Sequence, residues 1–95
     1  MVKRSKKRVW IVGIANSVNE EVFVERVYGS KEKVKKYLIR QAAIDRENNK
    51  ANWVTGTESS EHVKESSGAL YAVGCYKNYK VLYSAVPEKR PKTLF

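Results

Sequence analysis

One segment of this 95-residue chain has the apolar periodicity of a long helix, and strand-like runs stand on both sides of it. The helix is predicted over residues 31–47, where apolar side chains recur with a period of 3.6. Ser30 is its predicted N-cap, and Asn48-Asn49 is its predicted C-terminal stop. A chain of this length supplies one compact core, so one helix among strands predicts a single α+β domain.

The predicted helix has two faces of different character. Its apolar face is predicted to contain Val34, Tyr37, Leu38, Gln41, Ala42 and Ile44. The other side carries a basic stripe of Lys33, Lys36 and Arg40. This stripe is either a solvated helix face or an extension of a surface that binds nucleic acid.

The strand-like runs group into two hairpins. Residues 9–14 and 21–28 are predicted to form the first, and residues 69–76 and 79–86 the second, across the two-residue turn Lys77-Asn78. The order ββαββ predicts a four-stranded antiparallel sheet with one helix packed on one face. The turn sets the register of the second hairpin, because side chains alternate between the two faces of a strand. One face of that hairpin is therefore predicted to carry Leu70, Ala72, Gly74, Tyr76, Tyr79, Val81, Tyr83 and Ala85.

A single helix cannot cover both faces of such a sheet. The second face is predicted to carry Tyr71, Val73, Cys75, Lys80, Leu82 and Ser84. This face is either a surface for a ligand or partner, or it is covered by residues 50–68. Within that segment, residues 52–55 form a short edge strand or an anchored loop, and the polar residues 56–68 are expected to be a mobile loop.

The formal charge of +9 comes mostly from the two ends of the chain. Nineteen Lys and Arg residues stand against ten Asp and Glu residues. A basic arm, residues 1–8, carries +5 from Lys3, Arg4, Lys6, Lys7 and Arg8, and a basic tail, residues 87–95, carries a net +2. The domain between them, residues 9–86, keeps only +2. Arms of this kind neutralise phosphates without reading sequence.

No catalytic or metal-binding pattern stands out in the sequence. Cys75 and His62 are single residues of their kinds, so the chain has no internal disulfide and no thiolate zinc cluster. The glycines form neither a phosphate loop nor a dinucleotide fingerprint. No apolar run approaches the roughly 18 residues of a membrane-spanning helix. We therefore expect a cytoplasmic protein that is not an enzyme, takes no cofactor and has no membrane partner.

Three stretches of the chain resemble a class of small viral proteins. They are V-W-I-V-G-I at residues 9–14, E-V-F-V-E-R-V-Y-G-S-K-E-K-V-K-K-Y-L at 21–38, and L-Y-A-V-G-C-Y-K-N-Y-K-V-L-Y-S-A at 70–85. In this pattern the chain resembles small accessory proteins of phages and prophages of Gram-positive bacteria. The resemblance implies a non-enzymatic protein of the host cytoplasm, and several proteins of this class block defences such as CRISPR effectors. Many of those inhibitors are acidic DNA mimics, whereas this chain is basic.

Three functions follow as hypotheses. The first is binding to a host protein or ribonucleoprotein, which modulates or inhibits a nucleic-acid or defence complex such as a CRISPR effector. The second is sequence-nonspecific binding of DNA or RNA through the basic arms, and the third is a self-associating structural protein, a homodimer through the second sheet face. The residues predicted to contact nucleic acid or a partner are Lys3, Arg4, Lys6, Lys7, Arg8, Lys33, Lys36, Arg40, Tyr71 and Lys80.

Overall fold

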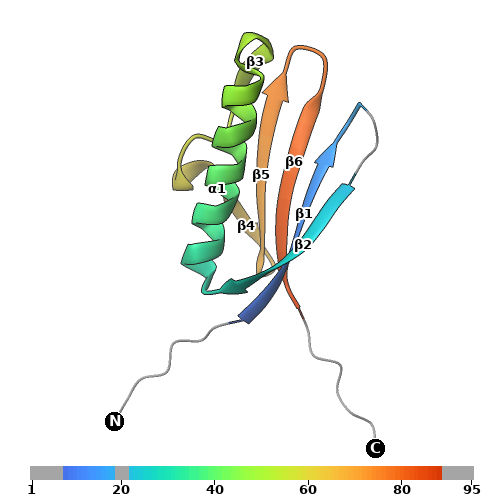
Figure 1. Ribbon diagram of the computed structural model, residues 1–95. Helices are drawn as coiled ribbons and strands as arrows, with labels where there is room; N and C mark the ends of the chain where they lie inside the picture. Colours follow the sequence, from blue (N-terminus) through green and yellow to red (C-terminus); the bar gives the residue numbers. More distant parts are fainter. Residues whose placement is uncertain (1–7, 19–21, 89–95) are drawn as a thin grey trace, which may run out of the picture.

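The computed structural model describes residues 8–18 and 22–88, and it places them in two layers, an antiparallel sheet and a long helix (Figure 1). The strands are β1 (Arg8–Asn16), β2 (Val22–Gly29), β3 (Trp53–Gly56), β4 (Lys64–Ser66), β5 (Ala69–Tyr76) and β6 (Lys80–Pro87). The helix α1 spans Lys31–Asn48, and the single-turn helices η1 (Lys50–Asn52) and η2 (Ser60–His62) follow it. No helix in these residues is long and apolar enough to cross a membrane.

The sheet has the strand order β2-β1-β6-β5-β3, and β4 also pairs with β5. The predicted α+β class is confirmed, and all four predicted strands are present. The prediction of four strands is wrong, because β3 and β4 add two short antiparallel strands beside β5. Of the two alternatives for residues 52–55, the structure has the edge strand, β3. Runs of four and three residues are too short to show an alternating pattern. These two segments are strands because they pair with β5, not because of a pattern in their own sequence.

The register of the second hairpin is as predicted. Tyr83 lies opposite Ala72 in the ladder, and the Tyr76 N–H donates to the Tyr79 carbonyl at 2.8 Å across the Lys77-Asn78 turn. The rings of Tyr76 and Tyr79 stack beside this turn with their centroids 4.7 Å apart. A two-residue turn leaves little freedom to slip, so the alternation of the two strands was sufficient to predict their faces.

The helix begins and ends at the predicted caps. The Ser30 hydroxyl accepts a hydrogen bond from the Lys33 N–H at 3.3 Å, and the Asn49 N–H donates to the Asp45 carbonyl at 3.0 Å. The buried line of α1 consists of Val34, Leu38 and Ala42.

Ile44 was predicted to belong to the apolar face of α1, and this prediction is wrong. Its side chain is 44% exposed. At 3.6 residues per turn, Ile44 stands about 120° around the helix from the middle of the buried line. The sheet lies beneath that line, so it does not reach Ile44.

The core lies between α1 and the sheet face that packs against it. Its buried members on the sheet are Trp10, Val12, Leu70, Ala72, Tyr76, Val81, Tyr83 and Ala85. Val63, which precedes β4, also joins the core. The indole N–H of Trp10 donates to the Gly29 carbonyl at 3.2 Å, which connects β1 to the end of β2 just before the helix starts.

Residues 50–66 pack on the helix side and along the β5 edge, not on the second sheet face. The Arg46 guanidinium lies over the Trp53 ring, 5.5 Å from its centroid, and donates to the Thr57 carbonyl at 3.2 Å. Lys31 forms a 2.9 Å ion pair with Glu65 on β4. The segment predicted as a loop over 56–68 therefore contains η2 and β4, and it leaves the second sheet face uncovered.

Candidate functional site

The sheet face opposite α1 is apolar and uncovered by any described residue. Figure 1 shows α1 and residues 50–66 together on the other side of the sheet or at its edge. The apolar side chains of the uncovered face are Val9, Ile11, Val22, Val24, Tyr28, Tyr71, Val73, Leu82 and Val86. We call these residues the open face. All except Val9 and Ile11 are between 38% and 63% exposed.

The ladder register brings the open-face residues into rows across four strands. One row runs Val22, Ala15, Leu82 and Val73, and the next runs Val24, Gly13, Ser84 and Tyr71. The Ser84 hydroxyl lies 3.4 Å from the Gly13 carbonyl, to which it donates. The middle of the second row is therefore built from small residues, with larger apolar side chains on β2 and β5.

Charged groups on this side lie both within the open face and at its border: Arg26 lies between Val24 and Tyr28 on β2. Arg26 pairs at 3.1 Å with Glu88, whose N–H donates to the Val9 carbonyl, so this ion pair crosses β1 on the open-face side. Lys64 lies opposite Tyr71, and Lys80 lies opposite Cys75. Among residues 8–18 and 22–88, no carboxylate pairs with either lysine. The border of the open face is therefore cationic.

The structure divides the predicted site residues between two sides of the molecule. Tyr71 and Lys80 lie on the open-face side, whereas the stripe of Lys33, Lys36 and Arg40 is exposed on α1. Arg8 is exposed at the start of β1, opposite Gly29. The remaining predicted residues, Lys3, Arg4, Lys6 and Lys7, lie outside the described residues.

Sequence reasoning missed the contribution of β2 to the open face. Val22, Val24 and Tyr28 are each 58–63% exposed. The alternation of apolar and charged residues in 22–28 was visible in the sequence. The connection between β1 and β2 is longer than a two-residue turn, however, so no turn type related its faces to those of β1.

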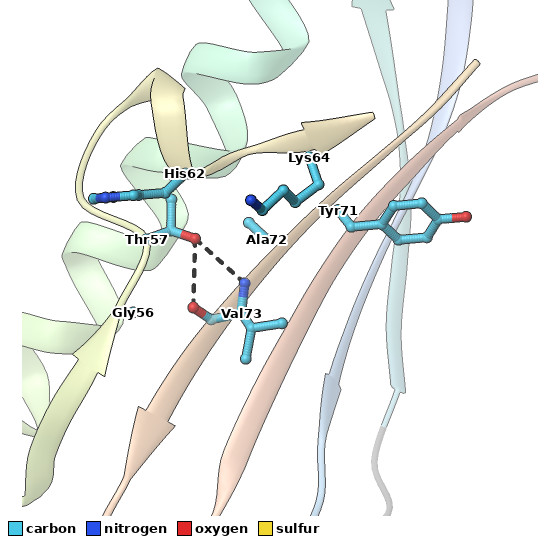
Figure 2. A pocket seen from close by; sticks show the side chains of 7 residues that line it. All are labelled: Gly56, Thr57, His62, Lys64, Tyr71, Ala72 and Val73. Carbon is cyan, nitrogen blue, oxygen red and sulfur yellow. Dashed lines mark hydrogen bonds between the residues drawn. The ribbon is translucent and has the colours of Figure 1, made fainter. Parts of the chain in front are cut away.

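A small cavity of about 230 Å³ lies beside β5, between β3 and β4 (Figure 2). The buried Thr57 closes the gap between these strands. Its N–H donates to the Val73 carbonyl at 3.0 Å, and its hydroxyl accepts from the Val73 N–H at 3.3 Å. His62 also lines the cavity, and its Nδ1 accepts from the Glu58 N–H at 3.0 Å. These polar groups hold the local fold.

The structure places Cys75 and His62 on different elements. Cys75 is half-buried on β5, opposite Lys80 and Thr55, whereas His62 ends η2. Within the described ranges, no group of three or more His, Cys, Asp or Glu side chains could hold a metal ion. The expectation of a non-enzymatic protein stays a prediction.

The groups with shifted pKa values belong to the packing of the helix side. Burial raises the pKa of Tyr76, and burial together with the Asp45 carboxylate raises the pKa of Tyr83. The hydrogen bond from Lys31 lowers the pKa of Glu65. These shifts therefore reflect the contacts of the core and of the β4 ion pair, and none of them concerns an open-face residue.

Comparison of the chain with protein-family models, with curated proteins and with solved structures gives no match. The function is therefore inferred from the site itself.

Proposed function

We propose that this protein is a non-enzymatic binding protein and that its open face docks a partner protein. The observation that carries the proposal is the apolar surface that spans four neighbouring strands, with seven large side chains that are 38–63% exposed. Strands of eight residues at the usual spacing give a face of about 20 by 25 Å. Soluble monomers rarely expose apolar patches of this size unless they bind something.

Protein is a better match to this face than single-stranded nucleic acid. Platforms that stack bases need neighbouring aromatic rings. The two tyrosines of the open face, Tyr28 on β2 and Tyr71 on β5, are separated by β1 and β6. Three strand spacings place them about 14 Å apart across the sheet, too far for successive bases. The other seven open-face residues are aliphatic and offer no ring on which a base could stack.

The border of the face indicates the chemistry of the partner. Lys64 and Lys80 favour an apolar surface flanked by carboxylates, because complementary charge steers association and excludes wrong partners. The resemblance to phage accessory proteins extends the proposal to a protein component of a host nucleic-acid or defence complex, of which a CRISPR effector is one example. In this proposal the protein inhibits or modulates its partner by occupying a surface.

Site-specific photo-cross-linking in a lysate of the host tests this proposal. A photoreactive residue replaces Leu82 on the open face, and the matched control carries it at Lys36 on α1. We expect a discrete protein adduct from position 82 that survives nuclease treatment, and none from position 36. The double variant Val73→Glu, Val86→Glu should abolish the adduct while the chain keeps its circular dichroism spectrum. Adducts that are equal at both positions, or that vanish with nuclease, contradict the proposal.

A second candidate function rests on the basic stripe of α1. Lys33, Lys36 and Arg40 are all exposed, and no described carboxylate pairs with them. With the cationic ends of the sequence, this stripe supports sequence-nonspecific binding of nucleic acid. It lies on the opposite layer from the open face, so variants can separate the two functions.

A further inference from the structure

The two edges of the sheet differ in how well they resist pairing with another chain. On one edge, β3 and β4 have four and three residues, and the register of β3 shifts between Trp53 and Thr55. On the other edge, β2 has eight residues, contains no proline and runs in continuous register with β1. Short strands and irregular pairing protect a sheet edge, and β2 has neither; its charged residues are Glu25 and Arg26 at its centre.

Several apolar side chains of β2 are exposed among the described residues, although Val27 packs against the core. Val22, Val24 and Tyr28 are about 60% exposed on the open face, and Phe23 is 57% exposed on the helix side. Figure 1 shows the far end of the β1–β2 hairpin lying away from α1. Arg26, which could guard the edge, pairs instead with Glu88 beyond the end of β6. An edge strand with exposed apolar residues on both faces matches a surface that becomes buried by strand addition.

The apolar pattern of β2 is symmetric about Glu25 at two of three pairs of positions, 23/27 and 22/28, whereas Val24 matches Arg26. Two-fold antiparallel pairing centred on Glu25 places Phe23 opposite Val27, and Val22 opposite Tyr28, of the second copy. Each of these apolar pairs forms twice. Val24 lies opposite the aliphatic stem of Arg26. The one unfavourable contact is Glu25 opposite its own copy, because like charges directly opposite each other weaken a sheet.

We propose that a second copy of this chain pairs with the β2 edge about a two-fold axis at Glu25, so that one sheet continues through both copies. A two-fold axis perpendicular to the sheet keeps both open faces on the same side. The dimer therefore joins the two open faces into a single, larger apolar surface. This inference rests on the β2 edge and does not depend on the proposed function.

The area available indicates a dimer that dissociates on dilution. The four most exposed side chains of β2 hold on the order of 400 Å² of accessible surface per copy. With the strand edges, two copies bury about 1,000 Å², which is near the lower limit for a specific interface. Two basic chains also repel each other at low salt. We therefore expect dimers at high protein concentration and monomers after dilution.

Sedimentation equilibrium of the full chain and three variants tests the pairing. Val24→Lys places a lysine opposite Arg26 of the second copy twice, and we expect dimerisation at least about tenfold weaker. Leu82→Lys makes the same charge change on β6, two strands from the edge, and should leave dimerisation unchanged. Glu25→Gln removes the like-charge contact and should tighten the dimer about two- to fivefold. A monomer at every concentration, or a dimer lost with Leu82→Lys but kept with Val24→Lys, overturns the proposal.

Cysteine trapping tests the register. In a Cys75→Ser background, Glu25→Cys brings two thiols directly opposite each other, whereas Val24→Cys leaves them offset by two residues. We expect mild oxidation to cross-link the first variant and not the second. Cross-linking that is equal in both variants, or stronger with Val24→Cys, contradicts the pairing centred on Glu25.

Discussion

The hydroxyl of Tyr83, a fully buried residue of β6, donates a hydrogen bond to the carboxylate of Asp45 in the last turns of α1. This contact connects the middle of the sheet to the C-terminal half of the helix. Burial and, after it, the hydrogen bond to Asp45 raise the pKa of Tyr83 far above its ordinary value of 10.0. Because the folded protein holds this proton more tightly than the unfolded chain does, the contact makes stability depend on alkaline pH.

Replacing Tyr83 by Phe tests that linkage. At neutral pH the variant should be about 1–2 kcal/mol less stable, because the half-buried Asp45 loses its donor. The contribution of Tyr83 is complete below its ordinary pKa of 10.0 and is lost as the pH rises above that value. The stability difference between wild type and variant should therefore narrow above about pH 10. Urea denaturation at pH values from neutral to above about 10 measures this stability difference, and Tyr71→Phe is the partly exposed control. A difference that stays constant with pH contradicts the linkage.

Gly56 holds β3 against β5, and we expect Gly56→Ala to weaken that contact. Its φ is +153°, and a Cβ there would lie 2.8 Å from both the Gly74 Cα and the Val73 carbonyl oxygen. Backbone atoms cannot move aside as a flexible side chain can. The free energy of unfolding of the variant should therefore be about 2–3 kcal/mol lower than that of the wild type. Gly68→Ala is the control, because its φ of +85° is strained but no atom lies within 4 Å of the added Cβ. The free energy of unfolding of Gly68→Ala should be only about 1 kcal/mol lower than that of the wild type, as measured by thermal unfolding. Equal losses in the two variants would show that steric contact at Gly56 is unimportant.

Arg46 attaches residues 53–57 to the helix through two contacts, and removing it should loosen that segment. Arg46→Ala loses the contact with the Trp53 ring and the hydrogen bond to the Thr57 carbonyl. We expect the free energy of unfolding to fall by about 1–2 kcal/mol. Hydrogen exchange should become faster at the amides of β3 and stay unchanged in the centre of β6. Lys50→Ala, which breaks an exposed ion pair with Glu47, serves as the control and should change stability little. Unchanged exchange in β3 would contradict this role of Arg46.

The parts of the fold that the sequence predicted are those determined by local signals. Ser30 capped the helix, and the Lys77-Asn78 turn related the faces of β5 to those of β6. The same turn and alternation correctly predicted that Tyr71 and Leu82 share the second face. These features depend on residues close in sequence, for which propensity and alternation are sufficient.

The parts that the sequence did not predict depend on contacts between distant segments. The sequence left residues 52–55 open between an edge strand and a loop and did not predict β4; pairing with the β5 edge makes both segments strands. The addition of β2 to the open face depends on its pairing with β1 through a connection of no simple turn type. Helical periodicity predicted that the basic stripe lies on one side of α1. It contains no information on which face of the sheet α1 covers. As a result the stripe and Tyr71, predicted as one binding set, lie on opposite layers.

The nucleic-acid hypothesis predicts a salt-dependent affinity for DNA, which the hypothesis of partner docking on the open face does not predict. One variant lacks residues 2–7, which include four cations, and a triple variant replaces Lys33, Lys36 and Arg40 with Glu. Binding to a labelled DNA duplex, followed by fluorescence anisotropy at several salt concentrations, should weaken in both variants. If the altered groups neutralise phosphates, the slope of log affinity against log salt falls by up to about 0.9 for each phosphate that is no longer neutralised.

The control for this experiment separates the position of the charge from the net charge. The double variant Val73→Glu, Val86→Glu leaves the arm and the stripe in place but makes the chain less basic. Lys77→Glu changes the net charge by the same amount at the hairpin turn, away from the open face and the stripe. Both of these variants should therefore shift DNA affinity equally and only slightly, and neither should change the salt slope. Affinity that is independent of salt, or a slope that is the same in wild type, the arm variant and the stripe variant, would exclude nucleic-acid binding through the arm and stripe and leave the open face as the functional surface.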